Sequence, residues 1–274
     1  MKPVLFLDSG IGGIPYCRYF HQRNPDQNIV YLADRLHFPY GSREKGELTA
    51  VLIELVKQII QTVNPCIIVL ACNTATLAAL TQLREQFPAL RFVGTVPAVK
   101  PAALASTTGK IGVLGTELTI KESYIKELAA QHGNVEIVGI AAPELVEFVE
   151  SRLDSATPEE TQEIVRRYMD RFRTAGVDSV VLGCTHFLFL EEVFRREAAP
   201  GIAVFESVKG IAQRIESLLA ESSAREENAS GASLAHGASG VPNRLLLTGA
   251  DAPEPSWAVW AERLGLNLAL LGEV

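Results

Sequence analysis

Short apolar runs alternate with longer amphipathic segments along the first half of the chain. A continuous apolar run is typical of a strand buried on both faces, and apolar residues at every third or fourth position are typical of a helix. The predicted strands are residues 4–7, 29–32, 66–71 and 91–95, and the predicted helices are residues 48–63 and 76–87. This alternation predicts an α/β fold with a parallel sheet covered by helices.

The second half of the chain follows the same plan. Its predicted strands are residues 110–114, 135–140, 179–182 and 202–205, and its predicted helices are residues 120–132, 158–174 and about 188–196. The segment 69–74 (Val-Leu-Ala-Cys-Asn-Thr) matches the segment 181–186 (Val-Leu-Gly-Cys-Thr-His), and the segment 4–9 resembles the segment 111–116. Two matches in the same order suggest the duplication of an α/β half.

The last part of the chain differs in composition. Residues 222–243 are rich in Ala, Gly and Ser, which predicts a flexible low-complexity insertion. A strand at 244–247, a helix at about 254–264 and a final strand at 266–271 follow. We therefore expect a first domain formed by residues 1–96 and 211–274, which includes the insertion, and a second domain formed by residues 97–210.

Composition narrows the class of protein. The 274 residues are 47% hydrophobic and carry 25 Lys and Arg against 32 Asp and Glu, for a net charge of −7. These values are typical of a globular chain, and the acidic balance argues against nucleic-acid binding. The longest uncharged stretch, residues 58–83, is interrupted by Asn-Pro and Asn-Thr, and no signal segment is visible, so we expect a cytoplasmic protein without membrane contact.

The four cysteines contain no Cys-x-x-Cys pair, and we expect free thiols. Cys72 and Cys184 each follow a buried strand directly and precede a helix. That is the carboxyl end of a parallel strand, where ligands bind, and a helix N-terminus favours thiolate. One such cysteine is more often structural, but two at matched positions indicate chemistry. Cys17 and Cys66 are interpreted as structural.

The segment 8–13, Asp-Ser-Gly-Ile-Gly-Gly, follows the first strand. Glycines there let the backbone approach a ligand closely. A dinucleotide fingerprint would need a third glycine where Pro15 stands, so that site is excluded. Asp8 is a candidate acid, base or ammonium contact.

His186 lies two residues after Cys184, which suggests a general acid or base beside the thiol. A zinc site is an alternative, but it needs further ligands that the sequence does not cluster. Residues 39–41, Pro-Tyr-Gly, indicate a turn. Glu144, Glu147 and Glu150 would lie along one side of a helix if one forms there.

Taken together, these motifs resemble the glutamate racemases of the cofactor-independent aspartate/glutamate racemase superfamily. The stretches that carry the resemblance are residues 8–13, 33–41, 71–75, 94–102, 111–116 and 182–186. It implies two pseudo-symmetric parallel-sheet α/β domains with the active site in the cleft between them. It also implies interconversion of L- and D-glutamate without a cofactor or metal, and a supply of D-glutamate for peptidoglycan, and hence for cell-wall biogenesis and cell shape.

The resemblance also implies roles for individual residues. Cys72 and Cys184 would be the acid/base pair, with Asp8, His186 and Glu150 as further catalytic residues, and Glu147 as the alternative to Glu150. The substrate contacts that it implies are Asp8, Ser9, Tyr40, Gly41, Asn73, Thr74, Thr185 and His186. The chain departs from the family at Phe187-Leu188, where Tyr-Pro is common, and in the residues before Glu150.

Two thiols suit a racemase, because one takes a proton from one face of Cα and the other returns a proton to the opposite face. Three alternatives stay open: a racemase for aspartate or another amino acid, a thiol hydrolase with a Cys184/His186 pair, and a non-catalytic amino-acid-binding protein. Whether the protein forms a homodimer is also left open.

Overall fold

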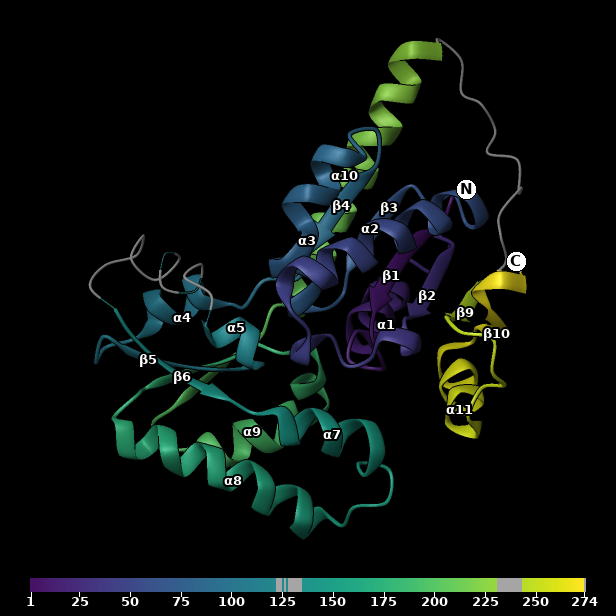
Figure 1. Ribbon diagram of the computed structural model, residues 1–274. Helices are drawn as coiled ribbons and strands as arrows, with labels where there is room; N and C mark the ends of the chain where they lie inside the picture. The colour runs from purple at the N-terminus through teal and green to yellow at the C-terminus, as the bar shows by residue number, and fades with distance from the viewer. Residues whose placement is uncertain (122–124, 126, 128–134, 231–242, 274) are drawn as a thin grey trace.

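The computed structural model describes residues 1–121, 125, 127, 135–230 and 243–273, and it contains two parallel β-sheets (Figure 1). The six-stranded sheet has the order β10 (Asn267–Leu270), β9 (Arg244–Leu247), β2 (Ile29–Ala33), β1 (Val4–Asp8), β3 (Ile67–Leu70), β4 (Arg91–Gly94). The four-stranded sheet has the order β6 (Glu136–Ala141), β5 (Lys110–Gly115), β7 (Ser179–Leu182), β8 (Ala203–Phe205). We call each sheet, with the helices that pack on it, the first and the second lobe.

The two sheets share one plan. In each, the earliest strand pairs with the second and third strands along the chain, and the third pairs with the fourth. The register agrees as well: Leu7 lies opposite Leu70 in the first lobe, and Leu114 lies opposite Leu182 in the second. These four residues are the ones that the internal sequence match aligns, so the duplicated α/β architecture is confirmed.

Helices cover both faces of the central strands. Leu5 and Leu7 of β1 enter the core under α2 and α3, while Val4 and Phe6 enter the core on the opposite face. A strand buried in this way has no polar face, which explains its continuous apolar run. The helices are α1 (Ile14–Arg23), α2 (Lys45–Thr62), α3 (Asn73–Gln86), α4 (Val99–Ala105), α5 (Glu117–Lys121), α7 (Pro143–Ser151), α8 (Pro158–Ala175), α9 (Glu191–Ala198), α10 (Val208–Ser230) and α11 (Pro255–Leu264). Short 3₁₀ turns are η1 (Arg35–His37), η2 (Tyr40–Ser42), η3 (Thr185–Leu190) and η4 (Leu271–Glu273).

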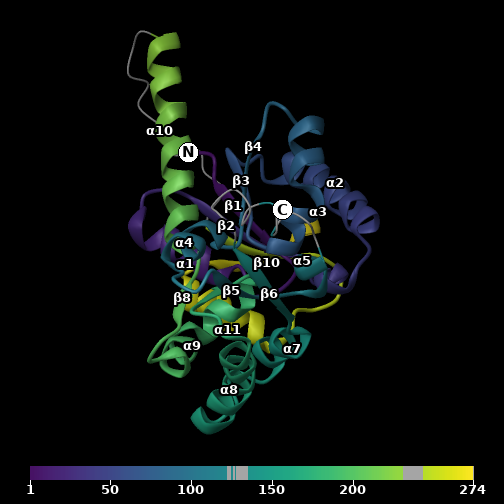
Figure 2. The same cartoon turned by 90° about the vertical axis from the view of Figure 1, so that its left-hand side faces the viewer.

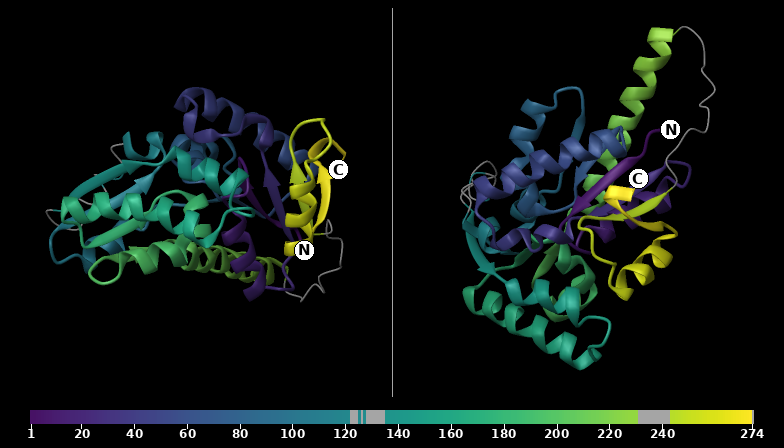
Figure 3. Two further views of the ribbon diagram at one scale, coloured as in Figure 1. Left: turned by 90° about the horizontal axis from the view of Figure 1, so that it is seen from below. Right: turned by 45° about the vertical axis from the view of Figure 1, so that its right-hand side comes forward.

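The C-terminal strands β9 and β10 extend the six-stranded sheet beyond β2. They lie on the side of that sheet away from the second lobe (Figures 1 and 3). All of their pairings are parallel, and β9 runs directly beside β2. The C-terminal part of the chain therefore belongs to the first lobe. The exact domain boundaries, at residues 96/97 and 210/211, stay a prediction.

The predicted loop at 222–243 differs from the structure at its start. Helix α10 continues through Ser230 and projects beyond the body of the protein (Figure 2). Ala, Arg and Glu at 224–227 are good helix formers, which explains why the helix persists among the serines. The remainder of the predicted insertion, 231–242, lies outside the described residues, as does most of the predicted helix at 120–132. Within the described part of the chain, no helix is long and apolar enough to span a membrane.

Candidate active site

Cys72 and Cys184 face one cavity from opposite lobes. Cys72 lies just after β3 and is the N-cap residue of α3. Cys184 occupies the equivalent position in the second lobe, just after β7 and at the N-cap of η3. Both thiols are buried and free; Cys17 is also buried and free, and Cys66 is free but only partly buried. The cavity has a volume of about 490 Å³. Of the predicted site residues, its wall includes Ser9, Tyr40, Gly41, Cys72, Asn73, Thr74, Glu147, Glu150, Cys184 and His186.

Asp8 and Thr185 lie immediately behind this wall and connect the two lobes. Asp8 is fully buried, and its Oδ2 accepts a hydrogen bond of 3.2 Å from the Thr185 hydroxyl. Its Oδ1 accepts bonds from the Gly10 N–H at 3.2 Å and the Ser9 hydroxyl at 3.3 Å. Burial raises the pKa of Asp8, against the opposing effects of His186 and the Gly10 N–H. Asp8 therefore supports the site and is suited to hold a proton there.

The Cys72 side of the cavity favours a protonated thiol. Burial raises the pKa of Cys72 well above its usual value, and the negative charge of Asp8 adds to this, while the backbone N–H groups of Ala75 and Thr74 oppose it. The helix N-terminus was expected to favour a thiolate at Cys72, but burial outweighs it. Beside Cys72, the buried Oδ1 of Asn73 has no hydrogen-bond partner among the described residues. It is an acceptor available to a bound ligand.

The Cys184 side carries a line of hydrogen bonds. Nδ1 of His186 lies 3.7 Å from Sγ of Cys184, and Nε2 of His186 lies 2.6 Å from Oε1 of Glu150. Burial alone would lower the pKa of His186, but the hydrogen bonds with Cys184 and Glu150 outweigh burial and raise it well above the usual value. A protonated imidazole can donate to the sulfur and to the carboxylate at once.

Glu150 belongs to α7, which confirms the helix considered for the three glutamates. Its Oε1 also accepts the Ile11 N–H at 2.9 Å, so the carboxylate joins the second lobe to the glycine-rich turn of the first. Gly10 lies so close that a Cβ there would meet Glu150 Oε1 at 2.0 Å. Glu147 also lines the cavity but is exposed. Position thus favours Glu150 over Glu147 as the partner of His186.

A chain of hydroxyl groups forms a further part of the wall. Thr74 and Thr116 lie 3.1 Å apart across the two lobes, and Thr116 lies 3.0 Å from Thr119. Sequence reasoning did not select Thr116 as a site residue. The internal match contained the signal, because Thr116 occupies in the second half the position that Ser9 occupies in the first.

Comparisons with known proteins agree with this geometry. Residues 18–215 match the Asp/Glu/Hydantoin racemase family. The chain belongs to this racemase family. A curated relative named glutamate racemase from Roseiflexus sp. (strain RS-1) is 37% identical over 222 residues, which are 80% of each chain. Another of that name, from Brucella anthropi, is 39% identical over 234 residues, which are 82% of each chain.

A solved structure extends the likeness over the full chain. The Escherichia coli glutamate racemase, in complex with L-glutamate and the activator UDP-MurNAc-ala, matches with a TM-score of 0.81 and 28% identity, over 98% of both chains. The racemase described here therefore has the two-lobed architecture of that enzyme.

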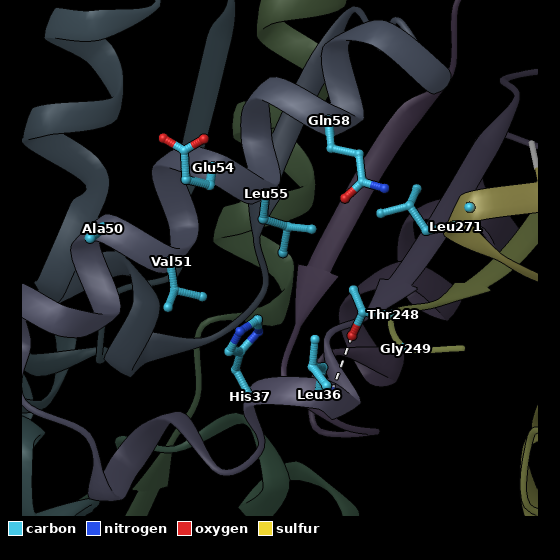
Figure 4. Close-up of a pocket in the computed structure, with 11 residues that line it drawn as sticks. Leu36, His37, Ala50, Val51, Glu54, Leu55, Gln58, Thr248, Gly249 and Leu271 are labelled. Carbon is cyan, nitrogen blue, oxygen red and sulfur yellow. Dashed lines mark hydrogen bonds between the residues drawn. The ribbon is translucent and has the colours of Figure 1, made fainter. Parts of the chain in front are cut away.

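In this racemase, a larger cavity of about 630 Å³ lies between α2 and the end of β9 (Figure 4). Its wall is mainly apolar and includes neither cysteine, so the smaller cavity is the better candidate for chemistry. Among the residues that the structure describes, no three His, Cys, Asp or Glu side chains are grouped to hold a metal ion.

Proposed function

We propose that this protein interconverts L-glutamate and D-glutamate by proton transfer at Cα between Cys72 and Cys184. The observation that carries the proposal is that the two thiols occupy matched positions in the duplicated lobes and line the same cavity. A planar carbanion held between the lobes would present one face to each sulfur. This arrangement is suited to inversion of a stereocentre, because the proton need not return to the face that it left.

Each turnover is balanced in protons. The thiolate on one side takes the Cα proton and becomes a thiol, and the electron pair of the broken C–H bond delocalises into the α-carboxylate. The thiol on the other side gives its proton to the opposite face of Cα and becomes a thiolate. In the reverse direction the two cysteines exchange roles. Rapid exchange with the unlike neighbours, Asp8 and His186, would reset the pair for the next substrate.

Groups suited to bind an amino acid surround the thiols. The N-terminus of α3 offers backbone N–H groups and partial positive charge for a carboxylate. The hydroxyls of Thr74 and Thr116 add donors, and the unpartnered Oδ1 of Asn73 is an acceptor for an ammonium group. Such donors, directed at a carboxylate that gains charge in the transition state, would substitute for a cofactor that withdraws electrons. We therefore assign substrate contacts to the predicted residues that line the cavity: Ser9, Tyr40, Gly41, Asn73, Thr74 and His186. Asp8 and Thr185 lie behind the wall and would act through these residues.

The choice of glutamate over aspartate is supported by the relatives and not by the shape of the cavity. Two relatives at 37% and 39% identity are named glutamate racemases, and the Escherichia coli structure was obtained with L-glutamate. A racemase with this substrate would supply D-glutamate, the use of which in peptidoglycan would link the protein to cell-wall synthesis. A cytoplasmic location fits that role.

The line Cys184–His186–Glu150 also supports a second candidate, a thiol hydrolase. In a hydrolase, Cys184 would be the nucleophile and Cys72 would have no part in the chemistry. The two candidates therefore make opposite predictions for a Cys72 variant.

The test follows the optical activity of L- and D-glutamate by circular dichroism in D₂O with no added cofactor. The wild type should lose the signal as deuterium enters Cα. Cys72→Ser and Cys184→Ser should each lower racemisation by about a thousandfold or more. Each should exchange deuterium into a different enantiomer, because each keeps a base on only one face. Cys66→Ser is the matched control and should match the wild type, because Cys66 lies outside the cavity.

Full racemisation by either site variant would overturn the two-base proposal. The variants are also tested for hydrolysis of esters and amides. If Cys184→Ser hydrolyses none of them and Cys72→Ser is fully active, the hydrolase is favoured.

A further inference from the structure

We propose that Asp34 and Thr248 are positioning residues that hold Tyr40 in the wall of the catalytic cavity. The proposal deepens the proposed racemase function and rests on it. Neither residue lines the cavity, and neither was predicted as a site residue, although Asp34 lies in the stretch 33–41 that carries the family resemblance. The case rests on one fully buried carboxylate and on the donors that converge on it.

Asp34 directly follows β2, and its side chain has no exposure to solvent. The Tyr40 hydroxyl donates to Oδ2 at 2.7 Å, and the Thr248 hydroxyl donates to Oδ1 at 2.6 Å. Nδ1 of His37 lies 2.9 Å from both oxygens. A buried carboxylate is stable only when such donors replace water, and here all three come from side chains. The loss of one donor would therefore change the position of the Asp34 carboxylate and of the other two side chains bound to it.

Tyr40 transmits this arrangement to the site. Its ring is 1% exposed and lines the cavity that contains both cysteines, while its hydroxyl points away to Asp34. The next residue, Gly41, approaches the second lobe so closely that a Cβ there would meet Thr116 at 3.0 Å. The position of the Tyr40 ring therefore fixes where η2 meets the second lobe. A displaced Tyr40 would enlarge the cavity and weaken contacts to the substrate.

Thr248 adds a contribution from the C-terminal part of the chain. It follows β9, which pairs with β2, and its backbone N–H donates to Ala33 beside Asp34. Its hydroxyl also accepts the Leu36 N–H at 3.1 Å, as Figure 4 shows at the edge of the larger cavity. Thr248 lies beyond residues 18–215, the part of the chain that matches the racemase family. The C-terminal strand pair thus does more than extend the sheet, because it supplies one of the three donors that Asp34 needs.

The test replaces the Thr248 hydroxyl without changing the shape of the side chain. Thr248→Val removes the hydrogen bond to Asp34 and the one from the Leu36 N–H. It should raise KM for both enantiomers roughly three- to tenfold and leave kcat within about twofold. Thr248→Ser keeps the hydroxyl and should restore the wild-type KM. Thr95→Val is the matched control, because Thr95 is also fully buried but its hydroxyl donates to the backbone oxygen of Leu70 and not to a side chain. If Thr248→Val does not fold, Thr248→Ala is used in its place.

A double variant tests whether Thr248 acts through Tyr40. Tyr40→Phe removes the hydroxyl that Asp34 holds, so adding Thr248→Val should raise KM little further. If the fold-changes in KM of Tyr40→Phe and Thr248→Val multiply in the double variant, the proposal is overturned. It is also overturned if Thr248→Val leaves KM unchanged, or if Thr248→Ser does not have the wild-type KM.

A measurement without substrate separates this proposal from the proposed function. In protein labelled with ¹³C at Cζ of tyrosine, the NMR signal missing from Tyr40→Phe identifies Tyr40. Thr248→Val should shift that signal, and Thr95→Val should not. If the wild type racemises neither enantiomer but Thr248→Val still shifts the Tyr40 signal, the racemase function alone is contradicted. An active wild type whose Tyr40 signal is unaffected by Thr248→Val would contradict the positioning proposal alone.

Discussion

Replacing Glu150 by Gln tests whether the charge of this residue keeps His186 protonated. The amide oxygen of the new side chain can still accept from Nε2 of His186 and from the Ile11 N–H, which now lie 2.6 and 2.9 Å from Oε1. The substitution therefore keeps the geometry and removes the negative charge. The hydrogen bond and the charge of Glu150 both help to raise the pKa of His186 against burial. We expect that pKa to fall in the variant.

The magnitude follows from the strength of the bond. A hydrogen bond to a charged partner contributes about 1.5–3 kcal/mol and a neutral one about 0.5–1.5 kcal/mol, so the lost charge removes about 1–1.5 kcal/mol. Both side chains are largely buried, at 5% and 17% exposed, so screening by solvent is small. Since about 1.36 kcal/mol is a factor of ten, kcat/KM should fall by up to roughly tenfold on the alkaline side of the pH profile, where the variant loses the His186 proton first.

The pH dependence has a definite sign. A histidine with a raised pKa stabilises the fold fully below its ordinary pKa of about 6.5, and this stabilisation is lost as the pH rises through the folded-state pKa. The alkaline decline of kcat/KM and of Tm should therefore begin at lower pH in E150Q than in the wild type. Circular dichroism assays and thermal melts from about pH 5 to about 10 would measure both.

Glu147→Gln is the matched control, because Glu147 lies on the same helix and lines the same cavity but is exposed. It should stay within about twofold of the wild type at every pH. Identical pH profiles for the wild type and E150Q would refute the reasoning, and so would a larger loss in E147Q than in E150Q.

Three further predictions concern the same site. Asp8→Asn should lower racemisation at least about a hundredfold and raise Tm by roughly 2–4 °C at neutral pH, because burial raises the pKa of Asp8 and its ionisation opposes folding. This gain in Tm should shrink as the pH falls through the folded-state pKa and vanish near the ordinary pKa of 3.8, and a gain that grows toward acid would contradict the assignment. Gly12→Ala should lower kcat about a hundredfold, because its Cβ would meet Nδ1 of His186 at 2.5 Å, whereas Gly46→Ala, with open space around it, should be fully active in the same assay. Dialysis against a chelator should leave activity unchanged, and recovery of a lost activity by zinc would show that a metal takes part.

The strands could be predicted because each one is a local signal. Strands β1, β3 and β7 are buried on both faces, and such strands are continuous apolar runs. The two catalytic candidates could be found because Cys72 and Cys184 each lie within two residues of the end of such a run. The internal match added information that a single motif lacks, since it related positions in one lobe to positions in the other.

Contacts between distant parts of the chain could not be predicted from the sequence. Asp34 and Thr248 meet only because β9 inserts beside β2, and nothing in the order of the strands along the chain specifies that neighbour. Helix α1 was not predicted, although Ile14, Cys17 and Phe20 on its buried face recur at every third position. His37 bonds to Asp34, three residues before it, and no motif in the sequence indicated this contact.

The unlike groups beside the two matched thiols cannot change the position of the equilibrium that the enzyme catalyses. The thiols stand in equivalent places, but the groups beside them are unlike: a buried carboxyl at one and an imidazole paired with Glu150 at the other. Two enantiomers of a free amino acid have equal free energy, so the equilibrium constant between them is unity. The ratio kcat/KM must then be the same in both directions, whatever the groups beside the thiols do. An unequal pair of proton donors can therefore never bias the product. It can only redistribute the barrier, so that a faster turnover in one direction is matched by a proportionally weaker apparent affinity for that enantiomer.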